Sequence, residues 1–100
     1  MIARTWKAWA TPENARRYEA LFVDVILPHV TSGVSGYRSA NLLKREAGEE
    51  IEFTTIFWFD SLDAVRRFAG EHLHRAVVPE AARRVLSRYD ETVEHHAVVV

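Results

Sequence analysis

The chain has 100 residues, 48% of them hydrophobic, with 13 basic and 14 acidic side chains and a formal net charge of −1. This length predicts one domain over residues 1–100, and the balanced charge, with no basic run longer than a pair, argues against a nucleic-acid partner. The lack of cysteine excludes disulfides, thiolate catalysis and cysteine-based metal sites.

The hydropathy of the sequence gives no sign of a membrane partner. No apolar run approaches the ~20 residues that span a bilayer. The N-terminus enters a strand pattern without the long apolar stretch of a signal peptide. We therefore expect a cytoplasmic protein.

The first expected element is a strand over residues 2–9. Side chains alternate across a strand, so Ile2 and Trp6 share one face with Arg4. A buried arginine needs an anionic partner, which a substrate anion or Glu94 can supply.

A helix follows, and the segment Thr11-Pro12-Glu13 marks its start with a capping residue, a proline suited to the first helical position and an acid in the first turn. Apolar residues then recur at helical spacing as far as Ile26. Pro28 is expected to end or kink this helix, and residues 31–36 have the composition of a loop.

Two further strands are expected over residues 37–45 and 50–59, joined by a turn at residues 47–49 into an antiparallel hairpin. The second of these strands is apolar on both faces, with Ile51, Phe53, Phe57 and Phe59 on one and Ile56 and Trp58 on the other. Helices can cover one face of such a sheet, and a second copy of the chain can cover the other. This strand therefore predicts a dimeric sheet protein with helices on its outside.

The C-terminal part predicts a helix, an undecided segment, a short helix and a last strand. One residue of the pair Asp60-Ser61 caps the helix, and Gly70 suits its C-terminal position. Residues 71–78 are ambiguous, and a short helical turn is one interpretation of them. Pro79 begins the short helix. Residues 92–100 predict the last strand.

The order of these elements is β-α-β-β-α-β with an extra short helix before the last strand. This is the ferredoxin-like pattern of the α+β class. Together with the two-faced strand, it predicts a homodimer with the helices on its outside.

Four short motifs, in this order along the chain, resemble those of the antibiotic biosynthesis monooxygenase-like domain: Met1-Ile2-Ala3-Arg4-x-Trp6, Phe57-Trp58-x-Asp60-Ser61-Leu62-x-Ala64, Phe68-Ala69-Gly70-Glu71 and Val93-Glu94-His95. The resemblance covers essentially the whole chain. It implies a dimeric α+β barrel in which two four-stranded sheets pack face to face and the helices lie outside.

The resemblance also bears on activity. Some relatives oxygenate polyphenolic or quinol-type substrates without flavin, haem or metal, others cleave haem, and many have no established activity. The haem-cleaving branch uses an Asn on the first strand and a Trp and a His around the second helix. Thr5, Phe68 and Val78 occupy those positions here, and Val78 cannot ligate iron, so the sequence disfavours haem degradation.

The five histidines give no metal-binding pattern. His95 and His96 are adjacent on a strand and point to opposite faces, and His72 and His74 diverge on the helix where we expect them. No H-x-x-x-H spacing is present. We expect neither a metal nor another cofactor.

His95 is the candidate catalytic base, because it lies on an apolar strand face and an imidazole titrates near neutrality. Arg4 and Tyr37 are candidate donors that stabilise a substrate anion. Flat walls for a small aromatic ligand are expected from Trp6, Trp58 and Phe68. The competing interpretation is that these side chains only pack the core or a dimer interface.

A cofactor-free oxygenase needs a dry pocket, a base and donors that stabilise an anion, so this chemistry leaves no strong sequence motif. The first hypothesis is a monooxygenase that acts on a phenolic or quinol-like aromatic without a prosthetic group. The alternatives are a non-catalytic dimeric module, either small-ligand-binding or stress-associated, and, less favoured, a haem-binding protein.

Overall fold

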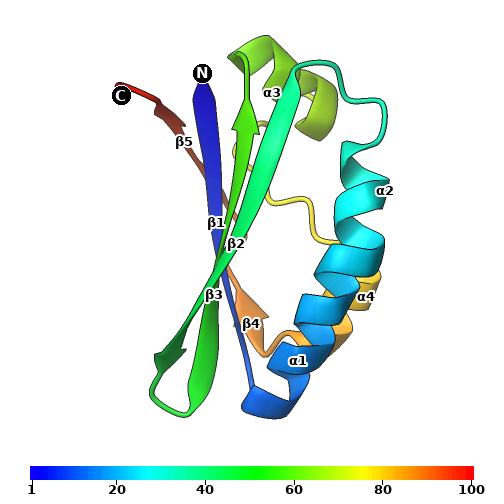
Figure 1. Cartoon of the computed structure of the whole chain (residues 1–100), viewed down its shortest axis with the longest axis vertical. Helices are drawn as coiled ribbons and strands as arrows, with labels where there is room; N and C mark the ends of the chain where they lie inside the picture. The colour runs from blue at the N-terminus through cyan, green and yellow to red at the C-terminus, as the bar shows by residue number, and fades with distance from the viewer.

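The computed structural model describes residues 1–100 and is built around one antiparallel sheet (Figure 1). Its strands follow the order β2-β3-β1-β4, and β5 also pairs with β1. Their bounds are β1 Ile2–Ala10, β2 Tyr37–Ala47, β3 Glu50–Phe59, β4 Arg88–Tyr89 and β5 Glu94–Ala97. This order confirms the predicted ferredoxin-like α+β fold, with the first and third strands side by side in the middle.

The helices are α1 Pro12–Leu21, the π-helix η1 Phe22–Ile26, α2 Leu27–Thr31, α3 Leu62–Ala69 and α4 Glu80–Val85. Two of their starts carry the caps that the sequence predicts. The Thr11 hydroxyl accepts a hydrogen bond from the Asn14 N–H, and the Ser61 hydroxyl accepts one from the Ala64 N–H. None of the helices is long and apolar enough to cross a bilayer.

The first helical stretch does not end at Pro28, as the sequence suggests, but continues to Thr31. The turn widens just before the proline, where the Leu27 N–H bonds the Phe22 carbonyl five residues back. A proline ring collides with the preceding turn of a regular α-helix, and a π-turn makes room for it. The π-turn also keeps Phe22 and Ile26 buried on the sheet side of the helix.

The last strand differs from the one predicted over residues 92–100. Its ladder covers only Glu94–Ala97, which pairs with one half of β1, while the two-residue β4 pairs with the other half. Between them the chain leaves β1, and Thr92 forms a bridge with Arg75 instead. Strand propensity does not predict that Thr92 pairs with Arg75, because this pairing depends on the tertiary structure.

Residues 71–79 form no helix, contrary to the helical reading of this segment. Its backbone is held by the segment that leaves β1: the Ala76 N–H donates to the Glu91 carbonyl at 2.9 Å, and the Val93 N–H donates to the His74 carbonyl at 2.8 Å. We refer to residues 71–79 as the crossing segment, because it runs between α3 and α4 along the edge of the sheet.

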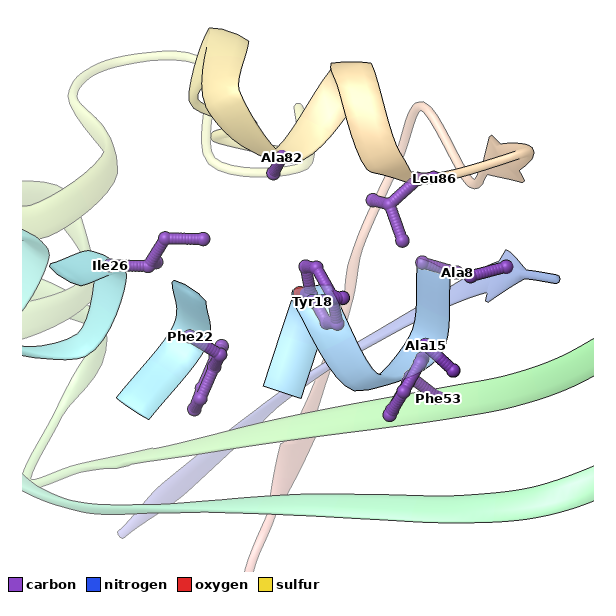
Figure 2. Packing of buried hydrophobic residues seen from close by; sticks show 9 residues of the cluster. Ala8, Ala15, Tyr18, Phe22, Ile26, Phe53, Ala82 and Leu86 are labelled. Carbon is purple, nitrogen blue, oxygen red and sulfur yellow. The ribbon is translucent and has the colours of Figure 1, made fainter. Parts of the chain in front are cut away.

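The helices lie on one side of the sheet (Figure 1), and the core fills the space between the two layers. Residues directly opposite in a ladder share a face, so Ala8 lies beside Phe53 on the helix side. Figure 2 shows how side chains from β1, β3 and the helical segments α1, η1 and α4 meet there, namely Ala8, Ala15, Tyr18, Phe22, Ile26, Phe53, Ala82 and Leu86.

The other face of the sheet, which we call the open face, carries no helix (Figure 1). The register places Ile56 and Trp58 there, as the two-faced pattern of this strand predicts. Leu43 on β2 lies opposite Thr54 on the same face and is 50% exposed. A single chain thus leaves an apolar surface uncovered on this side.

Gly36 is the glycine whose position leaves least room for a side chain. Its φ is +89°, and a Cβ added there would lie 2.5 Å from the Cβ of Ala64, which is fully buried on α3. We expect Gly36→Ala to lower the free energy of unfolding by about 3 kcal/mol, because left-handed strain adds to overpacking. Denaturant unfolding measures this loss.

Gly33→Ala is the matched control, since Gly33 has a φ of +73° and nothing within 4 Å of an added Cβ. It should lose only about 1 kcal/mol, which is the backbone strain alone. Adding Ala64→Gly to Gly36→Ala should recover part of the larger loss. Equal losses at the two glycines would contradict the steric account.

Candidate functional site

Arg4 is buried at the middle of the sheet, on the helix side of β1, and is only 2% exposed. Its Nη1 donates to the Leu73 carbonyl at 2.7 Å, and its Nη2 donates to the Arg75 carbonyl at 3.0 Å. The guanidinium also lies over the Phe68 ring, 5.4 Å from its centroid. These contacts tie the crossing segment to the sheet and offset the several kcal/mol that burying a charge costs.

His95 on β5 lies opposite Arg4 in the ladder, and its Nε2 is 2.9 Å from Arg4 Nη1. A guanidinium only donates hydrogen bonds, so Nε2 must accept and the proton of the neutral ring sits on Nδ1. Nδ1 is buried and has no hydrogen-bond partner within the chain. The His74 ring packs nearby, with 5.4 Å between the two ring centroids.

The environment disfavours a positive charge on both members of this pair. Burial lowers the pKa of Arg4 to about 10. Burial first, and then the neighbouring charges of Arg4, His74 and His96, lower the pKa of His95 to about 4. At neutral pH the pair is therefore a guanidinium cation hydrogen-bonded to a neutral imidazole.

Two small cavities lie between the sheet and the helices beside this pair. The first, of about 40 Å³, and the second, of about 30 Å³, share Trp6, Thr55, Phe57, Phe68 and Val77 in their linings. Arg4 closes one end of this pair of cavities, and Tyr18, Phe22 and Ile26 line the other end. We refer to the two together as the inner cavity.

A polar group sits in the otherwise apolar floor of the inner cavity. Thr55 is 3% exposed, and its Oγ1 has no hydrogen-bond partner. Burial raises the pKa of Tyr18, across the cavity on α1, to about 12, so its hydroxyl stays protonated at neutral pH. The Thr55 hydroxyl in part lowers the pKa of Tyr18, so the two hydroxyls lie close together, and a ligand oxygen placed here would meet groups that can each donate or accept.

A larger and more open cleft, of about 740 Å³, lies on the outer side of the crossing segment. Its lining is polar and includes His72, His74, Arg75, Arg83, Tyr89 and Glu91. Val78 lines both this outer cleft and the inner cavity, so the two hollows border one another at this residue.

The fold brings together four of the candidate site residues. Arg4 contacts His95 and Phe68 directly, and Trp6 lines the inner cavity with Arg4 and Phe68. All four lie on the helix side of the sheet or on α3 above it. Strand alternation puts residues 4 and 6 on one face, the antiparallel register brings residue 95 beside residue 4, and the packing of α3 brings residue 68 against Arg4.

Trp58 and Tyr37 lie apart from this group. Trp58 is opposite Ala3 in the ladder and faces the open side, where its Nε1 donates to Asn41 Oδ1 at 2.8 Å. Within one chain, Trp6 and Trp58 therefore do not form two walls of one pocket. The Tyr37 ring packs against Phe57 and Phe59 at the end of the sheet and lines neither hollow.

Sequence reasoning missed Tyr18, Thr55 and Val77, all of which line the inner cavity. Thr55 could have been found, because it interrupts the run Phe53, Phe57 on the helix-side face of β3 with a hydroxyl. Tyr18 was visible only as an apolar position of a helix. Val77 belongs to the crossing segment, whose path no local pattern predicts.

His72 and His74 lie on the crossing segment, where no helix forms, and both line the outer cleft. No three histidine or carboxylate side chains come together in an arrangement that could hold a metal ion. His96 faces the open side, where its Nε2 lies 3.3 Å from the Thr5 hydroxyl.

No family model matches the sequence, and no curated protein matches it either. Solved structures do share its fold. A mutant of MhuD with two manganese protoporphyrin IX molecules bound per active site is 17% identical over 100% of this chain and 96% of its own, with a TM-score of 0.69. Rv0793 from Mycobacterium tuberculosis is 20% identical over 99% and 95%, with a TM-score of 0.58.

A proposed antibiotic biosynthesis monooxygenase from Chloroflexus aurantiacus J-10-fl is 19% identical, over 99% of this chain and 92% of its own, with a TM-score of 0.56. At this level of identity the likeness concerns the fold. It confirms that the chain is built like the antibiotic biosynthesis monooxygenase-like domain that its motifs resemble.

The lowered pKa of His95 has a consequence for stability at acid pH. Its folded pKa is about 4, against 6.5 for a free imidazole. Between these values the unfolded chain binds a proton that the folded chain does not, so stability falls as the pH drops from about 6.5 to about 4. We expect thermal unfolding of His95→Gln to depend less on pH in this window.

Glutamine is the suitable replacement, because its side-chain oxygen can still accept the hydrogen bond from Arg4. His29→Gln, on the exposed surface of α2, serves as the control and should keep the pH dependence of the unchanged protein. If the melting temperatures of the unchanged protein and of His95→Gln fall by the same amount from pH 7 to pH 4, the lowered pKa of His95 is wrong.

Proposed function

We propose that this chain is a monooxygenase that acts, without a prosthetic group, on a small phenolic or quinol-like aromatic bound in the inner cavity. The observation that carries the proposal is a buried cation at the end of an apolar, largely enclosed cavity. Such a cation favours the deprotonated form of a phenol beside it and lowers the pKa of the bound phenol. The phenolate is the form that can pass an electron to oxygen.

Arg4 is the member of the Arg4–His95 pair that reaches the cavity. Its bonds to two carbonyls and one imidazole leave one hydrogen on Nη2 and one on Nε for a ligand oxygen. Because the guanidinium is held in place before a ligand arrives, it needs no reorganisation when negative charge develops. We assign it the stabilisation of the substrate anion.

The arrangement argues against His95 as the base that the sequence suggests. Its Nε2 lone pair already accepts from Arg4, and a second cation beside that guanidinium is disfavoured. An imidazole with a pKa of about 4 is also a weak proton acceptor for a phenol. We assign His95 the positioning of Arg4, and the phenolic proton leaves to solvent.

The overall reaction balances without an external reductant. A quinol and one O₂ give a hydroxyquinone and one water, so one oxygen atom enters the ring and the other leaves as water. The quinol itself supplies the electrons. The chain's part is to hold the anion beside Arg4, to exclude water from the apolar cavity and to retain the intermediate until the new C–O bond forms.

The inner cavity must enlarge before an aromatic ring can enter. A cavity of about 150 Å³ admits benzene, whereas the two hollows here measure about 40 and 30 Å³. Val77, Val78 and Pro79 of the crossing segment form one wall. The Pro79 carbonyl accepts hydrogen bonds from the Ala82 and Arg83 N–H groups at the start of α4, whereas no backbone hydrogen bond holds Val77 or Val78. We therefore assign the opening to Val77 and Val78.

A porphyrin, which the MhuD mutant binds, does not fit the same place in this chain. The inner cavity is far too small for a macrocycle, and Val78 has no atom that can ligate a metal. His72 and His74 both line the outer cleft, and the His74 ring packs on His95. We therefore route no step through haem.

A non-catalytic ligand-binding module is the second candidate, and one observation favours it. The hydroxyl of Thr55 is buried without a partner in an apolar cavity, which suits the capture of a small polar aromatic whether or not oxygen then reacts. Ligand binding without oxygen consumption would support this candidate.

We also propose that two chains associate through their open faces as a homodimer. The support is the apolar surface that β2 and β3 leave uncovered, with Leu43, Ile56 and Trp58 on it. Burying such a surface against its symmetric copy gives the isologous contact typical of homodimers. The inner cavity lies on the opposite side, so each chain would keep its own site.

Oxygen consumption without added cofactor tests the enzymatic proposal. We expect uptake above autoxidation with at least one member of a panel of anthrones, hydroquinones and flavonols. Arg4→Gln should lower it by at least about a hundredfold, as loss of one anion-stabilising donor does. Arg16→Gln, an exposed arginine on α1 without a partner, is the control and should not change the rate.

His95→Gln separates positioning from base catalysis in the same assay. Loss of a positioned Arg4 contact should lower uptake only severalfold, whereas loss of a general base costs about 10²- to 10⁴-fold. A loss in the latter range would restore the role that the sequence suggests. Absence of uptake from the whole panel, with folded protein, would sink the oxygenase proposal.

Light scattering at micromolar concentration tests the dimer. We expect twice the chain mass of 11.5 kDa, and Leu43→Glu should shift the protein towards the monomer by placing a charge on the open face. Val23→Glu, at a 60% exposed position of η1 on the helix side, is the matched control and should stay dimeric. A monomeric unchanged protein would show that the open face has another purpose.

A further inference from the structure

The inner cavity and the outer cleft meet at two points. Val78 lines both of them. The second point is an aromatic pair with 5.8 Å between ring centroids, in which Trp6 lines the inner cavity and Tyr89 lines the outer cleft. The two hollows therefore border one another at Val78 and beside the Trp6–Tyr89 pair.

Unpaired arginines gather in the outer cleft. Most arginines of the chain donate to a carboxylate or a carbonyl. Three have no such contact, and two of these three, Arg75 and Arg83, line the outer cleft. The third, Arg16, lies elsewhere on α1. A guanidinium presents five donors in a planar fork that matches a carboxylate, so an unpaired pair at one cleft is suited to an anionic group.

Buried neighbours fix the backbone at both arginines. The Arg75 carbonyl accepts from Arg4 at 3.0 Å, inside the core. Arg83 follows Ala82, which is 1% exposed and packs in the core from α4. Both arginines therefore line the cleft from anchored backbone positions, so only their side chains lose conformational freedom when they hold a ligand.

We propose that the two hollows form one bipartite site whose ligand is a small aromatic carboxylate, with the ring in the inner cavity and the carboxylate in the outer cleft against Arg75 and Arg83. Val78 lies between the two parts and determines which ligands can bridge them. The inference rests on the proposed function, because it takes the inner cavity as the place of the reacting ring.

Two acidic residues in the same cleft raise the alternative that the ligand carries a cationic group, and the test must distinguish the two. Glu71 and Glu91 also line it and would favour a cationic substituent. A carboxylate gains paired, charge-assisted hydrogen bonds from guanidinium groups, whereas an ammonium group meets single carboxylates as a point charge. The geometry of the donors thus favours the anion even though the formal charges of these four side chains balance.

The test is calorimetric titration of the intact protein under anaerobic conditions with three quinols that differ in one substituent. The probes are 2,5-dihydroxybenzoate, neutral 2-(hydroxymethyl)hydroquinone and cationic 2-(aminomethyl)hydroquinone. We expect the carboxylate to bind about tenfold tighter than the neutral probe, the factor that a charge-assisted hydrogen bond contributes. Arg75→Gln and Arg83→Gln should each weaken the carboxylate severalfold and leave the neutral probe unaffected.

Arg16→Gln removes the remaining unpaired arginine and should leave all three affinities unchanged. Val78→Ala should speed association of the carboxylate by opening the boundary between the hollows. Equal affinity for the three probes, tighter binding of the cationic probe, or no binding at millimolar concentration would each overturn the inference, as would insensitivity to both cleft substitutions.

Binding without oxygen separates this inference from the proposed activity. Carboxylate preference without oxygen uptake would leave the bipartite site standing and remove the oxygenase. Oxygen uptake from hydroquinones without carboxylate preference would support the oxygenase and remove the bipartite site.

Discussion

The burial of one guanidinium at the centre of the sheet constrains the rest of this structure. A charge in that place must be surrounded by acceptors, and Arg4 finds them in the Leu73 and Arg75 carbonyls and in the Nε2 of His95. The path of the crossing segment follows from this requirement, since its carbonyls must point inward at residues 73 and 75. The neutral state of His95 follows as well, because a second cation has no place beside the first.

The two faces of the sheet have different roles. The helix side holds the core, the inner cavity and the Arg4–His95 pair, whereas the open face holds apolar side chains that no part of the same chain covers. The inner cavity is formed by one chain alone. Association through the open face would therefore stabilise the sheet without building or blocking the site behind it.

The proposed function depends most on the crossing segment, which forms neither a helix nor a strand. It carries Val77 and Val78 into the wall of the inner cavity and His74 and Arg75 into the outer cleft. A few backbone hydrogen bonds to residues 91–93 and the contacts of Arg4 hold it in place. A wall of this kind can open locally while the sheet beneath it stays intact.

The sequence by itself determined β1 to β3, the helix starts at Pro12 and Leu62, the ferredoxin-like order and the two-faced character of β3, because local periodicity and capping report backbone conformation directly. It also placed Arg4, Trp6, Phe68 and His95 among the candidate residues. Only the tertiary structure decided that Trp58 lies on the open face, that residues 91–93 leave β1 for the crossing segment, and that His95 accepts from Arg4. These outcomes depend on strand register and on contacts between residues as far as 91 positions apart, and no local pattern encodes which of two faces or which distant partner a side chain meets.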